Sequence, residues 1–326
     1  MDRDESLFAH PIQRGRRSTA ALIGFAVVLS TAALAGVAWA AGFDSVRDRL
    51  VHPNWTWIVV GLCGQVPALL GYALAVHGIA AVEGGPTLGL RRAWAVVAAG
   101  FGPFVLHGGG FAVDLQVLKD AGLDEREARW RTFGLGVLEY AVLAPTACVA
   151  AIYLLVHGSA VPDGFTAPWA IAVPAGFAAA FAALRFRGRL QRRRGSGPTA
   201  LGEALEAVDI LRRLALSPGD GVPAFTGMAL YWAGEIFTLW ATLRAFLGGG
   251  PGIAALIIGY ATGYALTRRT LPLAGAGAVE ALLPFSLLWV HFPLAAAVLA
   301  VFAYRFYNAW LLLVPALFGR RALREA

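Results

Sequence analysis

The amino-acid sequence predicts an all-α, polytopic membrane protein: a helical bundle with about eight spans and at least one re-entrant hairpin. Composition is the first reason, because 58% of the 326 residues are hydrophobic and only 14% are charged. A soluble domain is about half apolar and about a quarter charged. The second reason is a series of apolar windows that approach the roughly 20 residues with which a helix crosses a bilayer.

The apolar windows set the expected order of helices along the chain. They run from Ala20 to Ala41, Trp55 to Val82, Phe133 to Val156, Thr166 to Ala183, Val222 to Phe246, Pro251 to Thr267 and Phe292 to Phe318. A charged flank, Met1 to Arg17, precedes the first window, which is longer than the apolar core of a signal peptide. We therefore expect the first window to remain in the protein as a transmembrane helix.

The distribution of basic residues predicts which connections face the cytoplasm. The chain divides into an N-terminal flank (1–19), a first membrane half (20–184), a linker (185–218), a second membrane half (219–319) and a tail (320–326). Flank, linker and tail concentrate the arginines, whereas 157–165 and 247–252 contain neither Lys nor Arg. By the positive-inside rule, both termini are then cytoplasmic and the protein is a multi-pass component of the cytoplasmic membrane.

Two membrane-length segments are interrupted by glycine and proline. Arg92 to Leu115 must return to the cytoplasmic side to keep residues 157–165 external, so we expect a re-entrant hairpin that lines a cavity. The same reasoning makes Leu271 to Val290 cross as a broken helix. Gly109 to Asp114 aligns with Gly275 to Glu280, and paired interruptions indicate a transporter site. A chain rich in Gly and Ala also produces such a likeness by chance.

The basic residues do not indicate nucleic-acid binding, although the net charge is +7. They flank apolar windows, as membrane topology requires, rather than one soluble face. Within the linker, Leu201 to Leu216 is amphipathic. Two interpretations stay open: an interfacial helix on an anionic inner leaflet, or a short cytoplasmic helix packed on the bundle.

Ionisable residues inside apolar windows are the candidate functional residues. A charge at that depth costs about 2.5–3.5 kcal/mol on insertion scales, so it faces a partner or a wet cavity. Glu280 follows a glycine-rich run in which Gly275 and Gly277 allow a ligand to approach backbone N–H groups. We expect Glu280 to pair with Arg305 or Arg269, or to titrate during transport. The alternative is a structural ion pair that holds the broken helix in place.

Arg305 lies in the middle of the last apolar window, with Tyr304 and Asn308 within one helical turn. Its guanidinium suits a lipid phosphate through charge-assisted, bidentate hydrogen bonds, unless Glu280 is its sole partner. Further candidates for the same substrate-binding site are Arg268, Arg269, Asp114, Glu139 and His107. The histidine is either a proton carrier or a packing residue. Glu139 and the similar Glu235 suit an internal polar contact equally well.

Several catalytic signatures are missing from the sequence. It contains no HExxH, GxSxG or GxxxxGK[ST] motif and no paired-aspartate motif for Mg²⁺. Cys63 and Cys148 have no metal-ligand spacing and are expected to be small core residues. We therefore expect no metal, no cofactor and no catalytic residues, which disfavours an ATP-driven machine and a metal-dependent lipid synthase.

The second half contains Leu271-Pro272, the glycine-rich run from Gly275 to Glu280, and Tyr304-Arg305. This pattern resembles the flippase-like integral membrane family related to the transmembrane domain of lysylphosphatidylglycerol synthase, which shows a proline, a run ending in Val-Glu, and a later Tyr-Arg. A weaker match is Leu138-Glu139, where the family often has Glu-Arg and Tyr140 here replaces the arginine. The resemblance covers roughly residues 20–320.

The resemblance implies a helical bundle with re-entrant elements that binds and translocates a phospholipid or polyprenyl-linked lipid. A membrane lipid is then the expected partner, with a second copy or a separate synthase as further partners to consider and no nucleic acid. The full synthase also has a soluble aminoacyl-transfer domain without a counterpart here, so we do not expect aminoacylation. Two other functions stay open: an enzyme acting on a lipid head group with Glu280 or Asp114 as base, and a scaffold docking through Leu201 to Leu216.

Overall fold

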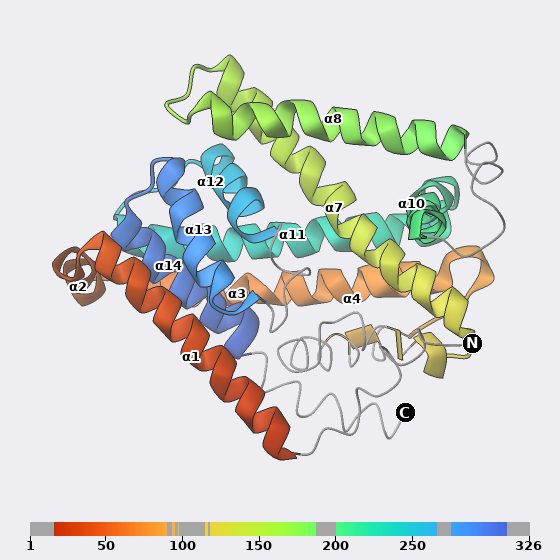
Figure 1. Cartoon of the computed structure of the whole chain (residues 1–326), viewed down its shortest axis with the longest axis horizontal. Helices are drawn as coiled ribbons and strands as arrows, with labels where there is room; N and C mark the ends of the chain where they lie inside the picture. The colour runs from red at the N-terminus through yellow and green to blue at the C-terminus, as the bar shows by residue number, and fades with distance from the viewer. Residues whose placement is uncertain are drawn as a thin grey trace.

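The computed structural model describes residues 16–89, 93–94, 97, 115–116, 118–186, 200–265 and 275–311. Every regular element in these ranges is helical, and the helices form a bundle (Figure 1). Four of them are long and apolar enough to cross a membrane: Ala21–Ala41, Trp55–Gly84, Glu125–Val156 and Asp163–Arg185. The prediction of an all-α bundle with membrane-length helices is confirmed at this level.

The helices follow the order of the apolar windows. They are α1 (Arg16–Ala41), α2 (Phe43–Val51), α3 (Trp55–Cys63), α4 (Gln65–Ala81), η2 (Val82–Gly84), α7 (Glu125–Val156), α8 (Asp163–Arg185), α10 (Ala200–Leu216), α11 (Pro218–Leu247), α12 (Ile253–Tyr260), η4 (Ala261–Ala265), α13 (Ala278–Trp289), α14 (Leu294–Arg305) and η6 (Phe306–Trp310). The π-helical turns η4 and η6 extend α12 and α14. Most of the window from Arg92 to Leu115, predicted to be re-entrant, lies outside the described residues.

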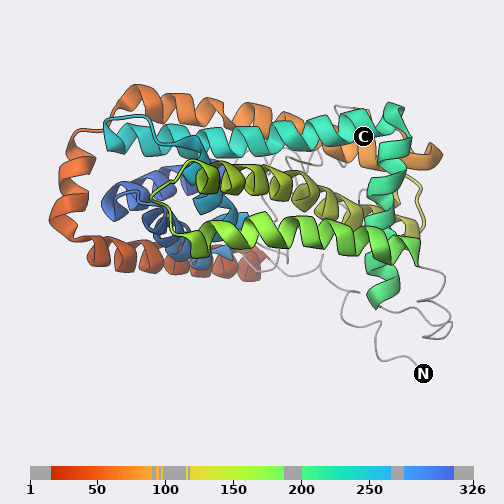
Figure 2. The ribbon, with the colours of Figure 1, turned by 90° about the horizontal axis from the view of Figure 1, so that it is seen from above.

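The long helices α4 and α11 run side by side through the bundle (Figure 2). Glycines at seven-residue spacing hold them together in an antiparallel pair: Gly64 approaches Gly234, Gly71 approaches Gly227, and Gly78 approaches Ala224. Small residues allow transmembrane helices to pack backbone against backbone. We call this contact, made by Gly64, Gly71, Gly78, Gly227 and Gly234, the glycine seam.

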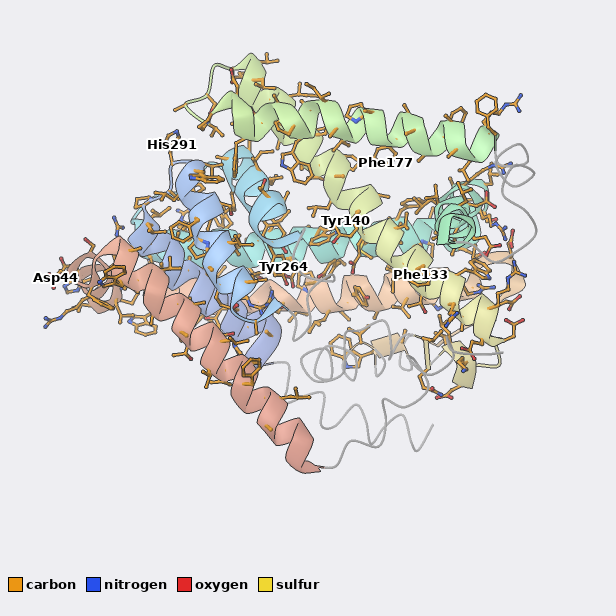
Figure 3. All side chains as sticks on the ribbon, viewed as in Figure 1. Asp44, Phe133, Tyr140, Phe177, Tyr264 and His291 are labelled. Carbon is orange, nitrogen blue, oxygen red and sulfur yellow. The ribbon has the colours of Figure 1, made fainter. Side chains whose placement is uncertain are left out.

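Two short helices, α2 and α10, lie across opposite ends of the bundle (Figure 2). At the α2 end, Asn54 N donates to the Ala245 carbonyl over 3.0 Å. At the same end, His291 Nε2 lies 2.7 Å from the Ala160 carbonyl oxygen, and Figure 3 shows His291 and Asp44 of α2 on this side. The connections after α2, α7, α11 and α13 therefore share one end of the bundle.

At the opposite end, α10 packs against α7, α8 and α11. Its Ile210 is fully buried and lies over Gly134 of α7, while Arg213 pairs with Glu83 and Asp209. Burial lowers the pKa of the Arg213 guanidinium, but hydrogen bonds to Asp209 and Glu83 outweigh it and raise the pKa above its ordinary value. The apolar face of α10 is thus covered by the bundle, as in the second interpretation of the linker.

The helices α12 and α13 are antiparallel neighbours. Gly259 of α12 contacts Leu287 and Val290, near the end of α13, whereas Gly263 of η4 contacts Leu283 and Ser286, closer to its start. Ser286 Oγ also donates to the Gly259 carbonyl over 2.7 Å. Gly275 and Gly277, which precede α13, therefore lie at the opposite end of this helix pair from the loops that precede α12 and follow α13.

Apolar side chains cover much of the outer surface. In α8 the apolar window has no buried residues, and Phe181 is 73% exposed; Figure 3 shows Phe177 on the same helix. Cys148 is buried as predicted, but Cys63 is exposed on α3, so the prediction of a core position for it is wrong. An apolar surface this extensive suits contact with hydrocarbon rather than with water.

A buried arginine fixes the end of α4. Arg131 of α7 is 3% exposed, and its Nη1 atom donates to the carbonyls of Ile79, Ala80 and Val82 over 3.1, 2.8 and 2.9 Å. The last carbonyls of a helix have no partner within the helix. Arg131 supplies that partner.

Replacing Arg131 with alanine is expected to lower the free energy of unfolding by about 3 kcal/mol, since hydrogen bonds to a charged donor contribute about 1.5–3 kcal/mol each. SDS-induced unfolding in mixed micelles measures the change. Arg126→Ala is the matched control, because Arg126 forms an exposed ion pair with Glu206, of a kind that contributes about 0–1 kcal/mol. Equal losses in the two variants would contradict the capping role.

Candidate functional site

A salt bridge between Arg305 and Glu280 is buried inside the bundle. Arg305 Nε donates to Glu280 Oε1 over 2.8 Å, and the residues are 3% and 0% exposed. Glu280 lies in the first turn of α13 and Arg305 is the last residue of α14, so the pair joins the two helices. Of the two predicted partners of Glu280, Arg305 is the one observed, and Arg269 lies outside the described residues.

Glu280 accepts two further hydrogen bonds. Ser30 Oγ of α1 donates to Oε1 over 3.1 Å, and Gly277 N donates to Oε2 over 2.8 Å. Gly277 precedes α13 with φ of +83°, a left-handed conformation that glycine adopts readily. Glu280 thus closes the first turn of its helix as the glutamate of a capping box does. In this conformation the Gly277 N–H, predicted to face a ligand, is occupied by Glu280.

A second buried carboxylate, Glu235 of α11, lies beside the salt bridge and is 1% exposed. Its Oε2 atom accepts hydrogen bonds from the Tyr304 hydroxyl, from Asn308 Nδ2 over 3.2 Å and from the Tyr260 hydroxyl over 3.4 Å. Tyr304 and Arg305 are consecutive residues. The end of α14 therefore contacts the carboxylate of α11 with one side chain and the carboxylate of α13 with the next.

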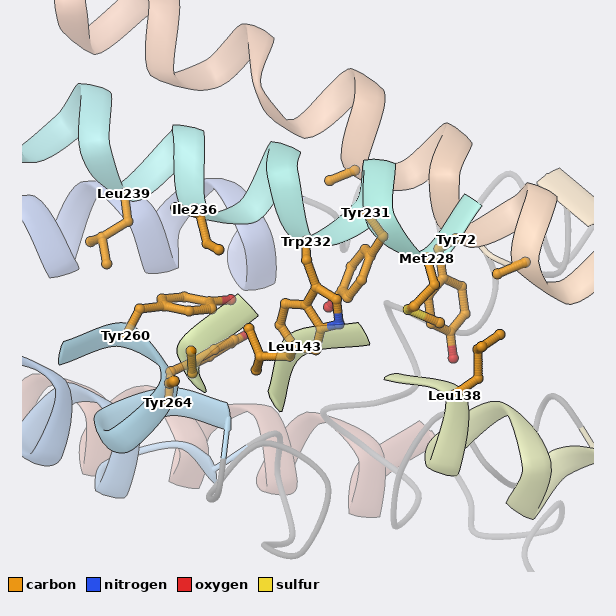
Figure 4. Close-up of a cluster of buried hydrophobic side chains, with 14 of the residues drawn as sticks. Tyr72, Leu138, Leu143, Met228, Tyr231, Trp232, Ile236, Leu239, Tyr260 and Tyr264 are labelled. Carbon is orange, nitrogen blue, oxygen red and sulfur yellow. The ribbon is translucent and has the colours of Figure 1, made fainter. Parts of the chain in front are cut away.

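Tyrosines surround Glu235 on the side of α12. The Tyr260 and Tyr304 hydroxyls are 3.0 Å apart, and Asn308 Nδ2 donates to the Tyr264 hydroxyl over 3.0 Å. Tyr260 and Tyr264 are seen side by side below α11 in Figure 4, with ring centroids 5.0 Å apart. We call Glu235, Glu280, Tyr260, Tyr264, Tyr304, Arg305 and Asn308 the polar cluster.

The polar cluster contains two carboxylates and one guanidinium. The Arg305 charge interacts with both Glu280 and Glu235, but the salt bridge joins it to Glu280. The hydrogen-bond partners of Glu235 are the neutral Tyr304, Asn308 and Tyr260. An ionised carboxylate is costly to bury without a directly bonded cation. Glu235 is therefore the group whose charge is less well compensated.

The predicted site residues are only partly brought together. Glu280, Arg305, Tyr304 and Asn308 meet in the polar cluster, beside the glycine break that holds Gly275 and Gly277. Glu139 is buried on α7 at 2% exposure, and its backbone carbonyl accepts the Trp232 indole N–H over 2.8 Å. The remaining predictions, His107, Asp114, Arg268 and Arg269, lie outside the described residues.

Sequence reasoning missed several members of the site. Ser30 is an ordinary polar residue in the first window, and its partner Glu280 is 250 positions away. Tyr260 and Tyr264 are four residues apart, which places both on one helix face; that spacing was the available signal. Glu235 is visible in the sequence as an acid in an apolar window, but its partners Tyr260, Tyr304 and Asn308 belong to other helices, so the window alone does not place it in the site.

Comparisons with known proteins do not assign the chain to a family. No protein-family model matches it, and a search of curated proteins finds no match. Fold and site define it as an all-helical protein with membrane-length apolar helices and a buried polar cluster.

Proposed function

We propose that this protein is a flippase-like transporter that binds and translocates a phospholipid or polyprenyl-linked lipid across the cytoplasmic membrane. The observation that carries the proposal is the Arg305–Glu280 salt bridge, buried among helices whose outer surfaces are apolar. Ionisable residues at membrane depth mark substrate or ion pathways more often than not. A guanidinium is the side chain best suited to the phosphate that both lipid classes carry.

The depth of the polar cluster supports this role. Glu235, Glu280, Arg305 and Ser30 lie 9 to 12 residues from the ends of their helices at the α2 side. At 1.5 Å per residue, this is about 14–18 Å along each helix, close to the middle of a hydrocarbon core about 30 Å thick. A head group at this position would be halfway between the two leaflets.

The proposed topology has both termini cytoplasmic and the α2 end external. In it α1, α3 with α4, α7, α8, α11 and α14 cross the membrane, and α12 with α13 forms a re-entrant hairpin from the external side. Two observations support the hairpin in place of the predicted broken crossing at Leu271 to Val290. The helices α12 and α13 are antiparallel, and the 12 residues of α13 extend about 18 Å, too short to cross.

In the absence of lipid, the Glu280 carboxylate would occupy the position on Arg305 that the lipid phosphate takes when it binds. In the closed conformation its carboxylate holds the Arg305 guanidinium and shields it from solvent. A phosphate entering the site would replace Glu280 as the partner of Arg305, so the guanidinium would never be left unpaired. Opening requires α13 to move relative to α14, and the glycine-rich break before α13 is where the backbone is best able to bend.

The two competing functions have less support. As a general base, Glu280 would have to face a substrate, yet three of the about four acceptor positions of its carboxylate are taken by Arg305, Ser30 and Gly277; Asp114 lies outside the described residues. As a scaffold, the protein would dock through the apolar face of α10, which the bundle covers.

Arg305→Gln is expected to reduce translocation of a fluorescent-headgroup phospholipid in proteoliposomes by about 10- to 100-fold, from the loss of about 1.5–3 kcal/mol of charge-assisted binding. Arg244→Gln is the matched control, because Arg244 stacks on Trp57 and Trp240 at the external end of α11. Translocation by Arg305→Gln at the wild-type rate would reject the role of the arginine. A change in lipid mass after incubation would instead establish the head-group enzyme.

A further inference from the structure

We infer that Glu235 is a proton-binding site, whose carboxylate takes up one proton from water on one side of the membrane and later returns it to water. Coupling of this proton to lipid movement rests on the proposed function, whereas proton binding itself does not. The proposal is carried by the geometry around Glu235: a buried carboxylate, neutral hydrogen-bond partners that are able to reverse their roles, and a buried acceptor atom without a partner.

The first argument is the division of charge in the polar cluster. Arg305 is joined to Glu280 by the salt bridge, whereas the hydrogen bonds to the Glu235 carboxylate come from Tyr260, Tyr304 and Asn308. Glu235 nevertheless lies near the guanidinium charge, which makes its ionised form attainable inside the bundle. Ionised and protonated states are thus both within reach, as a group that binds and releases a proton requires.

The second argument is that the partners of Glu235 are suited to both states. Tyr260 and Tyr304 donate to the carboxylate through hydroxyl groups, and a hydroxyl also accepts hydrogen bonds. If Glu235 is protonated, a tyrosine hydroxyl is able to rotate and accept a hydrogen bond from the carboxyl group. The backbone does not have to move. A lysine or arginine in either position would have fixed Glu235 as an anion.

The third argument is the Asn308 side chain. Its Nδ2 atom donates to both Glu235 and Tyr264, while its Oδ1 atom is buried and has no hydrogen-bond partner. A buried acceptor left unpaired is unfavourable. Rotation of the amide by half a turn would place Oδ1 opposite a protonated Glu235, which would then donate to it. Protonation of Glu235 would therefore give Oδ1 a donor, while Nδ2 would move to the position that Oδ1 now occupies.

Two neighbouring elements present titratable or charged groups that interact with Glu235: α12 with η4, through Tyr260 and Tyr264, and α14, through Tyr304 and Arg305. Other helices packed against α11 also carry titratable groups, among them Tyr72 of α4 and Glu139 of α7. Arg305 is the one cation whose charge is found to interact with Glu235 among the described residues. A change in the charge of Glu235 therefore acts mainly on the electrostatic energy of the Arg305 guanidinium.

Protonation of Glu235 changes the net charge that an anionic lipid head group would meet in the polar cluster. With Glu235 ionised, the two carboxylates outnumber the single guanidinium and repel a phosphate. A protonated Glu235 leaves Arg305 and Glu280 in balance, and an entering phosphate then restores the same net charge that the ionised Glu235 had provided. Uptake of a proton and entry of a phosphate compensate each other, so the lipid and the proton are expected to move together.

The direct test is infrared spectroscopy of the full chain in lipid bilayers over a pH series. The carbonyl stretch of a protonated carboxyl group is expected to appear as pH falls, to be lost in Glu235→Gln, and to persist in Glu280→Gln. Tyr304→Phe removes a donor to the ionised form, so the band is expected to appear about one to two pH units higher. A band that persists unchanged in Glu235→Gln, or no band in the wild type, would overturn the proposal.

Proteoliposomes then test the coupling. An imposed proton gradient is expected to accelerate translocation of an anionic phospholipid by the wild type. In Glu235→Gln the translocation rate is expected not to depend on the gradient, and in Glu235→Asp the dependence is expected to return. If the wild-type translocation rate does not depend on the proton gradient, the coupling is rejected and the transport function is unaffected. A Glu235 band without any lipid translocation would overturn the transport function and leave the proton site standing.

Discussion

Replacing Glu280 with alanine is expected to destabilise the protein by about 3–5 kcal/mol, the range for removing one member of a buried ion pair. The loss comes mainly from Arg305, which is 3% exposed and would keep its charge without the carboxylate that it contacts at 2.8 Å. The first turn of α13 would also lose its cap, because Gly277 N donates to Glu280. SDS-induced unfolding in mixed micelles measures the change in unfolding free energy.

The matched control for this prediction is removal of both charges. A charge left unpaired in the interior is the main cost of breaking a buried ion pair, so adding Arg305→Met to Glu280→Ala is expected to recover part of the stability lost in the single variant, while the smaller side chain and the missing cap keep the rest of the loss. Glu280→Gln should have an intermediate effect, since an amide keeps an acceptor for Ser30 but not the negative charge. Additive losses in the double variant would show that the two side chains act independently.

Replacing Gly71 with alanine is expected to lower the free energy of unfolding by about 3 kcal/mol, at the upper end of the range for overpacking. The added Cβ would lie 2.5 Å from both the Gly227 carbonyl oxygen and the Tyr231 amide nitrogen. These are backbone atoms of α11, so the clash is relieved only by moving one helix away from the other. The thermal midpoint in detergent is the measurement.

Gly176→Ala on α8 is the control for the glycine seam. Both glycines are inside helices, where alanine is favoured over glycine by about 1 kcal/mol, but a Cβ at Gly176 would meet nothing within 4 Å. We therefore expect this variant to be neutral or slightly more stable. Equal behaviour of the two variants would mean that the close approach of α4 and α11 contributes nothing to stability.

Much of the fold follows from apolar windows, because a long apolar helix is recognised by length and composition alone. The windows starting at Ala20, Trp55, Phe133 and Thr166 all correspond to candidate membrane spans. The antiparallel arrangement of α12 and α13 was harder to predict. Parity of spans limits only whether the number of crossings is odd or even, and the direction of a short helix depends on contacts such as that between Gly259 and Leu287.

The candidate site was predictable in part. Charge in an apolar window identified Glu280 and Arg305, and their salt bridge was one of the expected outcomes. Ser30 and the tyrosines were not predictable in the same way, since polar uncharged residues are tolerated in many membrane helices and their partners are distant in sequence. Arg131 was missed because it lies at the edge of its window, where an arginine is ordinarily explained by topology.

The seven-residue spacing of the glycine seam has a consequence for the alignment of α4 with α11. If α11 slides by seven residues, Gly71 meets Gly234 in place of Gly227, so the seam by itself does not distinguish the two positions. The choice is made by polar side chains: Gln65 Nε2 donates to Thr238 Oγ1 over 2.9 Å, a bond that sliding breaks. The glycine seam therefore sets how closely α4 and α11 approach, and the Gln65–Thr238 hydrogen bond sets their register, which fixes the height of Glu235 in the bundle.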